Sequence, residues 1–255
     1  GAKAKSDRVD SEKTAVLLRG GLMPRAYAYP ADMRATRDLM RRRLLFVRQR
    51  GSLLAHIQIT HHQYNVDPPA KRITYRSNRE GLGEGFEDSS VRHSIAADLT
   101  VADHLEVVIG ELELAVLRQA RIHDPNAFAL LTSVPGIGKV LALTILYEIH
   151  DISRFPSVRD FASYSRLVKC ERSSAGKSLG SGGNKIGNAY LKWAFSEAAV
   201  LFIAKSEQGR TVLKRLERKY GKPKALSVLA HKLGRAVYYM LARKQAFDPQ
   251  RFATS

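Results

Sequence analysis

The sequence predicts a mostly α-helical protein. Apolar residues recur every three or four positions through long stretches, and this spacing places them on one face of a helix. The two longest stretches run from Ala31 to His62 and from Ser90 to Ile122. Segments that alternate apolar and polar residues, as half-buried strands do, are scarce. Helices should therefore form most of the structure.

A shorter helix is predicted from Ser6 to Arg19, with Ser6 as its N-cap and Gly20-Gly21 as its end. Asp7 and Asp10 are three residues apart, so they lie on one face of this helix. Two carboxylates so placed can share a divalent metal ion. Acidic residues in a first turn also stabilise the helix dipole, and the residues alone favour this simpler interpretation.

The two long helices are predicted to pair as an antiparallel coiled coil, whose role would be reach or dimerisation rather than chemistry. The segment 67–87 lies between them. It contains Pro68-Pro69 and three glycines but few apolar residues. This composition is typical of a loop or a mobile insertion.

A helix, a tight turn and a second helix are predicted from Phe128 onward. The turn is Pro135-Gly136-Ile137-Gly138. Backbone N–H groups at the start of the second helix can hold a nucleic-acid phosphate without reading sequence, as helix-hairpin-helix elements do. A plain turn between core helices is the alternative. Further helices are predicted over 155–164, 189–205 and 225–244, and a basic run joins the last two.

A loop rich in serine, glycine and lysine is predicted between 173 and 188. Glycines allow a backbone to approach a ligand closely, and lysines supply charge for phosphate. A serine held there is a candidate for phosphate chemistry, and an ordinary surface loop is the alternative. The segment is not a nucleotide-binding P-loop, because Glu171 stands where that motif needs a glycine before Gly176-Lys177.

The charge of the chain suits a polyanionic partner such as nucleic acid. The 255 residues carry a net charge of +18. Seven arginines lie between 34 and 50 and seven basic residues between 210 and 224, whereas 93–117 holds five acids and no Lys or Arg. We expect the two basic zones to bind nucleic acid. No apolar run is long enough to span a bilayer, and a single cysteine excludes a disulfide and fits a reducing cytosol.

Several of these segments, in this order, resemble the IS-one-ten family of insertion-sequence transposases, which are DEDD/serine recombinases guided by a structured bridge RNA. The C-terminal matches are Pro135-Gly136-Ile137-Gly138, Phe161, Leu167, the Ser/Gly loop, Asn184-Lys185-Ile186-Gly187-Asn188 and Leu191. Two further matches are Lys5-Ser6-Asp7-Arg8-Val9-Asp10-Ser11, which resembles the end of the family's RuvC-like domain, and Lys222-Pro223-Lys224-Ala225 to Tyr238 followed by Phe247-Asp248-Pro249, which resembles its C-terminal helix.

The resemblance implies three domains. Residues 1–25 would be the C-terminal end of a RuvC-like α/β DEDD domain, 26–122 a helical coiled-coil linker with a loop insertion at 67–87, and 123–255 the serine-bearing transposase domain with its helix-hairpin-helix-like element. The family's first Asp and its Glu have no counterpart here. We therefore expect the chain to lack the N-terminal part of the RuvC-like domain and to be incomplete for activity.

The resemblance also implies roles for single residues. Asp7 and Asp10 would be the last two of four acids that hold Mg²⁺, and a serine of the loop would join covalently to DNA. Its position relative to Leu167 and Gly180 assigns this nucleophile to Ser174, with Ser173 as the runner-up. The residues expected to contact nucleic acid, on their own chemistry, are Gly136, Gly138, Lys139, Arg172, Lys177, Lys185, Lys214, Arg215, Lys222 and Lys224.

The implied function is that of a transposase that cleaves and rejoins DNA through a covalent serine–phosphate intermediate, without ATP. Its partners would be donor and target DNA, a structured guide RNA and further copies of itself, as a dimer or tetramer, and no membrane. Such a protein would work in the cytoplasm of a bacterial or archaeal cell, at the nucleoid. The alternative is a non-catalytic helical module that binds nucleic acid.

Overall fold

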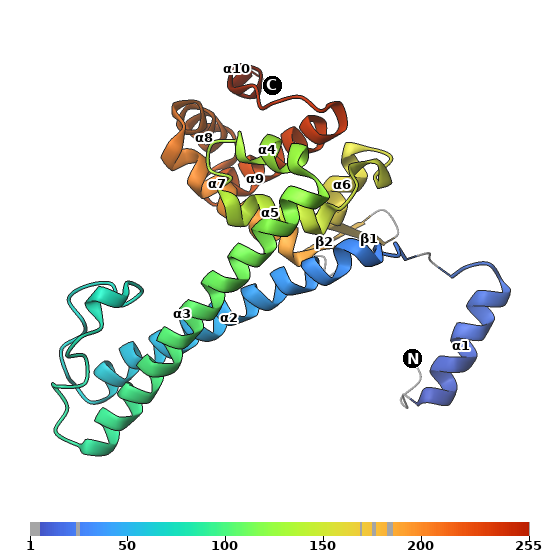
Figure 1. The fold of residues 1–255 in the computed structure, drawn as a ribbon. Helices are drawn as coiled ribbons and strands as arrows, with labels where there is room; N and C mark the ends of the chain where they lie inside the picture. Colours follow the sequence, from blue (N-terminus) through green and yellow to red (C-terminus); the bar gives the residue numbers. More distant parts are fainter. Residues whose placement is uncertain (1–5, 24–25, 169, 175–176, 183–185, 255) are drawn as a thin grey trace. The chain divides into compact units, whose positions relative to one another are not determined.

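A computed structural model describes residues 6–23, 26–168, 170–174, 177–182 and 186–254 (Figure 1). The chain divides into two compact units, Gly1–Ala31 and Asp32–Ser255. The prediction of a mostly helical protein is confirmed, because helices contain most of the described residues.

The smaller unit contains one helix, α1 (Asp7–Arg19). The Ser6 side chain accepts a hydrogen bond from the Val9 N–H at 3.4 Å, and Gly20 forms the C-cap. The helix and both its ends are therefore as predicted. None of its residues is buried. That this helix closes a RuvC-like domain stays a prediction.

The larger unit begins with two long helices, α2 (Ala31–Gln63) and α3 (Ser89–His123). Their bounds agree with the apolar periodicity to within one residue. Arg43 pairs with Glu113 at 2.6 Å and Arg50 with Glu106 at 3.4 Å, and a hydrogen bond of 2.6 Å joins His56 to Asp98. In these contacts, residues later in α2 meet residues earlier in α3. The two helices therefore run antiparallel, as predicted (Figure 1).

These ion pairs give part of the basic zone 34–50 a structural role. Arg43 and Arg50 bind carboxylates of the acidic stretch on α3, and nucleic-acid binding by the zone stays a prediction. The side chain of Arg41 pairs with Glu148 in the same way. These arginines hold the chain together, because the acids that neutralise them come from helices distant in sequence.

The connection between α2 and α3 is also better ordered than its composition suggested. It contains a short 3-10 helix, η1 (Arg76–Asn78), and the buried side chains of Ile73 and Phe86. Arg79 is 5% exposed and donates to the carbonyl oxygens of Ile73 and Thr74, and it also pairs with Glu106 at 3.0 Å and with Asp103. The segment 67–87 is therefore a loop anchored to α3 rather than a mobile insertion.

The remaining elements form a helical body that follows α3. They are α4 (Pro125–Thr132), α5 (Lys139–Ile149), η2 (Ile152–Arg154), α6 (Val158–Tyr164), β1 (Cys170–Ser174), β2 (Lys177–Gly182), α7 (Ala189–Lys205), α8 (Glu207–Tyr220), α9 (Lys222–Arg243) and α10 (Pro249–Thr254). Helix α5 is the centre of the body, because each of its residues from Leu141 to Ile149 is buried. Burial raises the pKa of Tyr147 on this helix to about 12.

Aromatic side chains fill the interface of α6, α7 and α9. Phe161 contacts Phe195 and Tyr238 with ring centroids 6.0 and 5.8 Å apart. Phe202 contacts Phe252 of α10 at 5.2 Å. Such rings bury large apolar areas, so this cluster contributes much of the free energy of folding.

Two predictions of local structure in this body were wrong. The basic run expected to join two helices is mostly helix α8, on which Gly209, Val212 and Leu216 are buried at helical spacing. The Ser/Gly loop contains an antiparallel pair of strands, β1 and β2.

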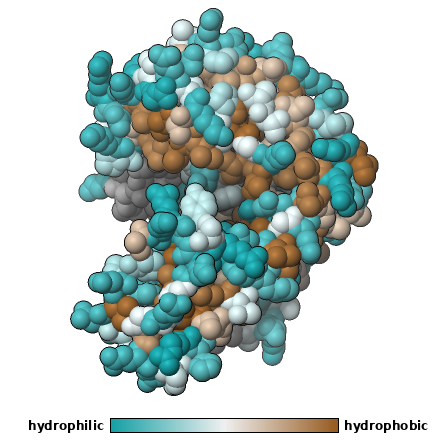
Figure 2. Space-filling model, turned by 60° about the vertical axis from the view of Figure 1, so that its left-hand side comes forward, coloured by the Kyte–Doolittle hydropathy of each residue, from teal (hydrophilic) through white to brown (hydrophobic). Residues whose placement is uncertain are grey.

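The surface of the molecule mixes both kinds of side chain. In Figure 2, hydrophobic residues gather in patches between hydrophilic ones on the face shown. Exposed apolar side chains are normal on folded proteins. Hydropathy alone therefore marks no binding site on this face, and the search for one rests on charge and geometry. Within the part of the chain that the structure describes, no helix is long and apolar enough to cross a membrane.

Candidate functional site

The candidate nucleophile lies on the β hairpin. Ser173 is paired with Ser178, and Ser174 with Lys177, across the two strands. A register shift between Glu171 and Ser173 interrupts the pairing. Ser174 is therefore the last residue of β1 before the turn, and the side chain of Lys177, at the start of β2, is exposed. Arg172 lies on β1, and Lys185 lies outside the described residues.

The base of this hairpin is closed by Asn188. Its backbone N–H donates to the Tyr164 carbonyl oxygen at 2.6 Å, which joins the end of α6 to the start of α7. Arg166 donates from Nε to the carbonyl oxygen of Gly187 at 3.0 Å. Gly187 has φ 103°, and a Cβ there would lie 2.6 Å from the same Tyr164 oxygen. Only glycine fits this close approach without strain.

The Asn188 side chain connects the hairpin base to the buried core. Its Oδ1 accepts hydrogen bonds from the N–H groups of Tyr190 and Leu191, so it caps α7. Its Nδ2 donates to Oε2 of Glu148 at 2.6 Å. Asn188 thus satisfies the start of α7 and a buried carboxylate at the same time.

Glu148 is the centre of this polar cluster. Its side chain is 4% exposed, and Arg41 of α2 binds both of its oxygens at 2.7 Å. These hydrogen bonds raise the pKa of the Arg41 guanidinium, which also lies 4.8 Å from the centre of the Tyr190 ring. A bidentate pair of this kind fixes orientation as well as contributing energy. The cluster therefore fixes α2, α5 and the base of the hairpin relative to one another.

The glycines of the turn before α5 have different surroundings. Gly136 is buried with φ 93°, and a Cβ there would lie 2.5 Å from the backbone nitrogen of Phe202 on α7. Its role is packing, so the expectation that Gly136 contacts nucleic acid is corrected. Gly138 caps α5 without a side chain, and both Gly138 and Lys139 are exposed. These two lie where a phosphate can approach; a helix-hairpin-helix element stays a prediction.

The predicted metal residues lie on α1. Asp7 and Asp10 are both exposed and line a shallow hollow with Ser11 and Thr14. Within the described part of the chain, no three His, Cys, Asp or Glu side chains are grouped so that they could hold a metal ion. Two exposed carboxylates leave most ligands of Mg²⁺ to water. Asp7 and Asp10 therefore fit part of a magnesium site, not a complete one.

The basic residues predicted around 210–224 are placed together. Lys214 and Arg215 are exposed on α8, and Lys222 and Lys224 are exposed at the start of α9. Gly221, with φ 79°, separates the two helices. These four cations therefore lie on either side of the connection between α8 and α9.

Comparison with known proteins identifies the class. Residues 128–214 match the model of the Transposase IS116/IS110/IS902 family. This segment runs from within α4 into α8 and contains both hairpin strands and Asn188. This segment of the chain is therefore similar to transposases of that family.

Individual relatives lead to the same family. A protein of Sinorhizobium fredii (strain NBRC 101917 / NGR234) named "Putative transposase y4qE" is 25% identical over 244 residues, which cover 96% of this chain and 60% of that protein. The transposase for insertion sequence element IS1111A of Coxiella burnetii (strain RSA 493 / Nine Mile phase I) is 27% identical over 119 residues, 45% of this chain and 33% of that protein. The resemblance to IS-one-ten (IS110) transposases is thus confirmed, and the chain spans at most 60% of the length of these two relatives.

A third relative has a different name. The Holliday junction branch migration complex subunit RuvA of Sphingopyxis alaskensis (strain DSM 13593 / LMG 18877 / RB2256) is 36% identical over 75 residues, 29% of this chain and 37% of that protein. This similarity covers less of the chain than either transposase match.

Sequence reasoning missed the Glu148 cluster. Arg41 and Glu148 are 107 positions apart, so no local pattern connects them. One signal was present, since Glu148 is a lone acid within the otherwise apolar helix α5. A charged residue there must find a partner when it is buried.

Proposed function

We propose that the protein which carries this chain is a DNA transposase that cleaves and rejoins DNA through a covalent bond to Ser174. One observation carries the proposal: the family match at 128–214 spans the β hairpin on which Ser174 lies. The hairpin is joined to the helical body through the Asn188 and Glu148 contacts, which suits a group that must be positioned.

The proposed chemistry is a transesterification. The Ser174 hydroxyl oxygen attacks a DNA phosphorus, its proton passes to a base, and the bond from phosphorus to one sugar oxygen breaks. The departing sugar oxygen takes up a proton and becomes a hydroxyl. Attack by a sugar hydroxyl of another strand then releases the serine and forms the new phosphodiester. One ester replaces another at each step, so ATP is not required.

Cationic groups near the hairpin suit this reaction. A serine needs activation to attack, and charge on the phosphoryl oxygens needs stabilisation. Lys177 pairs with Ser174 across the strands and its side chain is exposed, so it is the cation best placed to contact a phosphate bound there. Arg172 and the backbone N–H groups of β2 are further candidates.

Three finer features belong to the same proposal. A structured guide RNA would select the DNA by base pairing, which suits a chain of net charge +18. Two or more copies would assemble, so that the serine of one works beside the acids of another. Mg²⁺ would be held by Asp7 and Asp10 together with acids beyond the described residues, and it would neutralise phosphate charge.

The proposal is tested by trapping the intermediate. The full-length protein that carries this chain is incubated with guide RNA, Mg²⁺ and end-labelled DNA, and the products are separated on a denaturing gel. We expect a labelled protein–DNA adduct, and mass spectrometry of its peptides should place the nucleotide on Ser174. An adduct on Ser173 would move the assignment by one residue. Cleavage without any adduct would exclude the serine mechanism.

The two acids of α1 give a second prediction. Asp7→Asn and Asp10→Asn should each lower DNA cleavage by about 100-fold or more, because each removes a charged metal ligand. The helix should survive, since both side chains are exposed. Mg²⁺ titrations of cleavage and circular dichroism are the measurements. The exposed acid Glu12 on the same helix provides the control, Glu12→Gln. Unchanged cleavage in both Asp variants would leave these acids as helix-dipole residues only.

A non-catalytic module that binds nucleic acid is the second candidate function. The similarity to RuvA, a subunit of a complex named for Holliday junctions, favours this reading of the helical part. Tight binding of RNA and DNA with no adduct under any condition would support it.

A further inference from the structure

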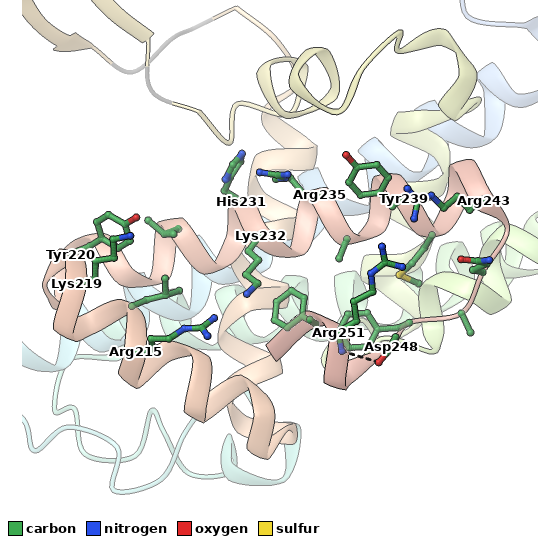
Figure 3. Close-up of a pocket in the computed structure, with 18 residues that line it drawn as sticks. Arg215, Lys219, Tyr220, His231, Lys232, Arg235, Tyr239, Arg243, Asp248 and Arg251 are labelled. Atoms are coloured by element: carbon green, nitrogen blue, oxygen red, sulfur yellow. Dashed lines mark hydrogen bonds between the residues drawn. The ribbon is translucent and has the colours of Figure 1, made fainter. Parts of the chain in front are cut away.

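A basic groove lies between α8, α9 and α10. Its lining residues come later in the sequence than the hairpin that carries Ser174. Its volume is about 960 Å³. Figure 3 shows its walls: His231, Arg235, Tyr239 and Arg243 follow one side of α9 at four-residue spacing, and Lys232 extends from α9 toward α8, with Arg215 on that helix and Arg251 on the C-terminal segment. We refer to this space as the α9 groove.

The charge of the α9 groove is strongly one-sided. Among its described lining residues, the Lys and Arg side chains are Arg215, Lys219, Lys232, Arg235, Arg243 and Arg251, whereas Asp248 is the acid. The Asp248 carboxylate accepts hydrogen bonds from the Gln250 and Arg251 N–H groups, so it caps α10. The groove therefore presents an excess of positive charge to whatever enters it.

Neighbouring cations in the groove also affect one another. Burial and the nearby Arg215 lower the pKa of Lys232, and burial and Arg235 lower the pKa of His231. An anion placed between these groups would offset the repulsion from Arg215 and Arg235, though not the effect of burial. The groove is thus suited to a ligand with negative charge.

Aromatic rings lie among these cations. Arg243 stacks over the Tyr239 ring at 4.8 Å, Lys219 over Tyr220 at 5.3 Å and Lys232 over Phe252 at 4.9 Å. Tyr239 is 37% exposed and Tyr220 is 42% exposed, so part of each side chain is open to solvent. A lining that alternates cations with exposed rings suits a ligand that carries both phosphates and flat bases.

The contrast with α2 strengthens this assignment. There, Arg41, Arg43 and Arg50 bind Glu148, Glu113 and Glu106. Of the C-terminal basic zone at 210–224, Arg215 and Lys219 line this groove, whose lining is poor in acids. Six Lys and Arg side chains beside one acid should give the α9 groove a strongly positive potential.

We propose that the α9 groove binds an unpaired nucleic-acid strand, with Arg235 and Arg243 on its phosphates and Tyr239 stacked on a base. Arg235 and Arg243 are eight residues and so about 12 Å apart along the helix, with Tyr239 halfway between them, which leaves room for a base between two phosphate contacts. Base stacking needs bases that are not already paired. A closed duplex could offer its phosphates to the groove but not its base faces.

The proposal is tested by measuring how tightly the 255-residue chain binds nucleic acids. Fluorescence anisotropy is measured with labelled oligonucleotides of about 12 residues: oligouridine, oligothymidine and a duplex of the same length. We expect one or both single strands to bind more tightly than the duplex. The stronger of the two shows whether RNA or DNA is the preferred strand, and equal binding shows that the sugar is not read.

Two variants separate the phosphate and base contributions. Tyr239→Leu should weaken single-strand binding about tenfold and duplex binding much less, because a duplex loses only the support that the ring gives to Arg243, whereas a single strand also loses base stacking. Arg235→Gln with Arg243→Gln should weaken single-strand binding and reduce the slope of log affinity against log salt by about 1.4, the value for two phosphate contacts. Circular dichroism and the urea midpoint check that each variant is folded.

A matched control removes the same charge elsewhere. Arg159 on α6 and Arg118 on α3 are exposed, do not line the groove and lie outside both basic zones. Arg159→Gln with Arg118→Gln should change the affinity by less than twofold. An equal loss in this control, tighter binding to the duplex, or no effect of Tyr239→Leu would each overturn the proposal. Binding does not require serine chemistry, so the Ser174→Ala chain should bind normally whether or not the proposed transposition mechanism holds.

Discussion

Replacing Ser174 with Ala should abolish the covalent adduct and lower DNA cleavage on the order of 10⁴-fold or more in the full-length protein. The reason is that alanine has no oxygen to attack phosphorus. Binding of DNA and RNA should remain, because the exposed Lys177 and the basic helices are unchanged. Cleavage rates from denaturing gels and affinities from anisotropy measure the two effects separately.

Ser173→Ala is the matched control, since it removes the same group from the neighbouring position of β1. Cleavage should fall much less in this variant. The reverse pattern would assign the nucleophile to Ser173. Full activity in both variants would show that neither serine is the nucleophile.

Replacing Glu148 with Gln should lower the free energy of unfolding by about 2 kcal/mol, because a buried carboxylate that accepts hydrogen bonds from Arg41 and Asn188 is lost while Arg41, 33% exposed, keeps contact with water. The amide keeps the shape of the side chain, so the loss reports charge and hydrogen bonding rather than a cavity. Glutamine has one acceptor oxygen in place of two, so either Arg41 or Asn188 would face an N–H donor, and the start of α7 should become less protected. Urea unfolding measures the first effect and hydrogen exchange at Tyr190 and Leu191 the second.

Glu113→Gln is the control for this experiment. Glu113 also pairs with an arginine of α2, Arg43, but its side chain is 35% exposed. Water screens such a pair, so the expected loss is below about 1 kcal/mol. An equal loss in both variants would mean that burial does not set the strength of the Glu148 cluster, contrary to the argument from its 4% exposure.

Local signals were sufficient to predict much of the fold. The cap at Ser6, the long apolar repeats of α2 and α3, and the start of α7 at Ala189 all follow from residues within one or two turns. Helix α8 was missed because its many charges outnumber the narrow apolar stripe of Val212 and Leu216. A count of apolar spacing, rather than of charge, would have found it.

The β hairpin could not be predicted for a different reason. Serine, glycine and lysine have low strand propensity, and these strands are built mainly from them. The contacts that hold the ends of this segment together join Tyr164 and Asn188, which lie 24 positions apart, so no local pattern reveals them. The candidate site residues could be proposed from the order of several sequence motifs. Where these residues lie relative to the buried core could be learned only from the structure.

The hydrogen bond between Asn188 and Tyr164 holds together the two ends of the segment that contains β1 and β2. Lengthening a loop whose ends are already held costs little, about 0.6 kcal/mol for each doubling. The length of the hairpin can therefore change while the helical body stays as it is. If Ser174 is the nucleophile, as proposed, relatives with longer or shorter hairpins would place it at a different reach from the same body, at almost no cost in stability.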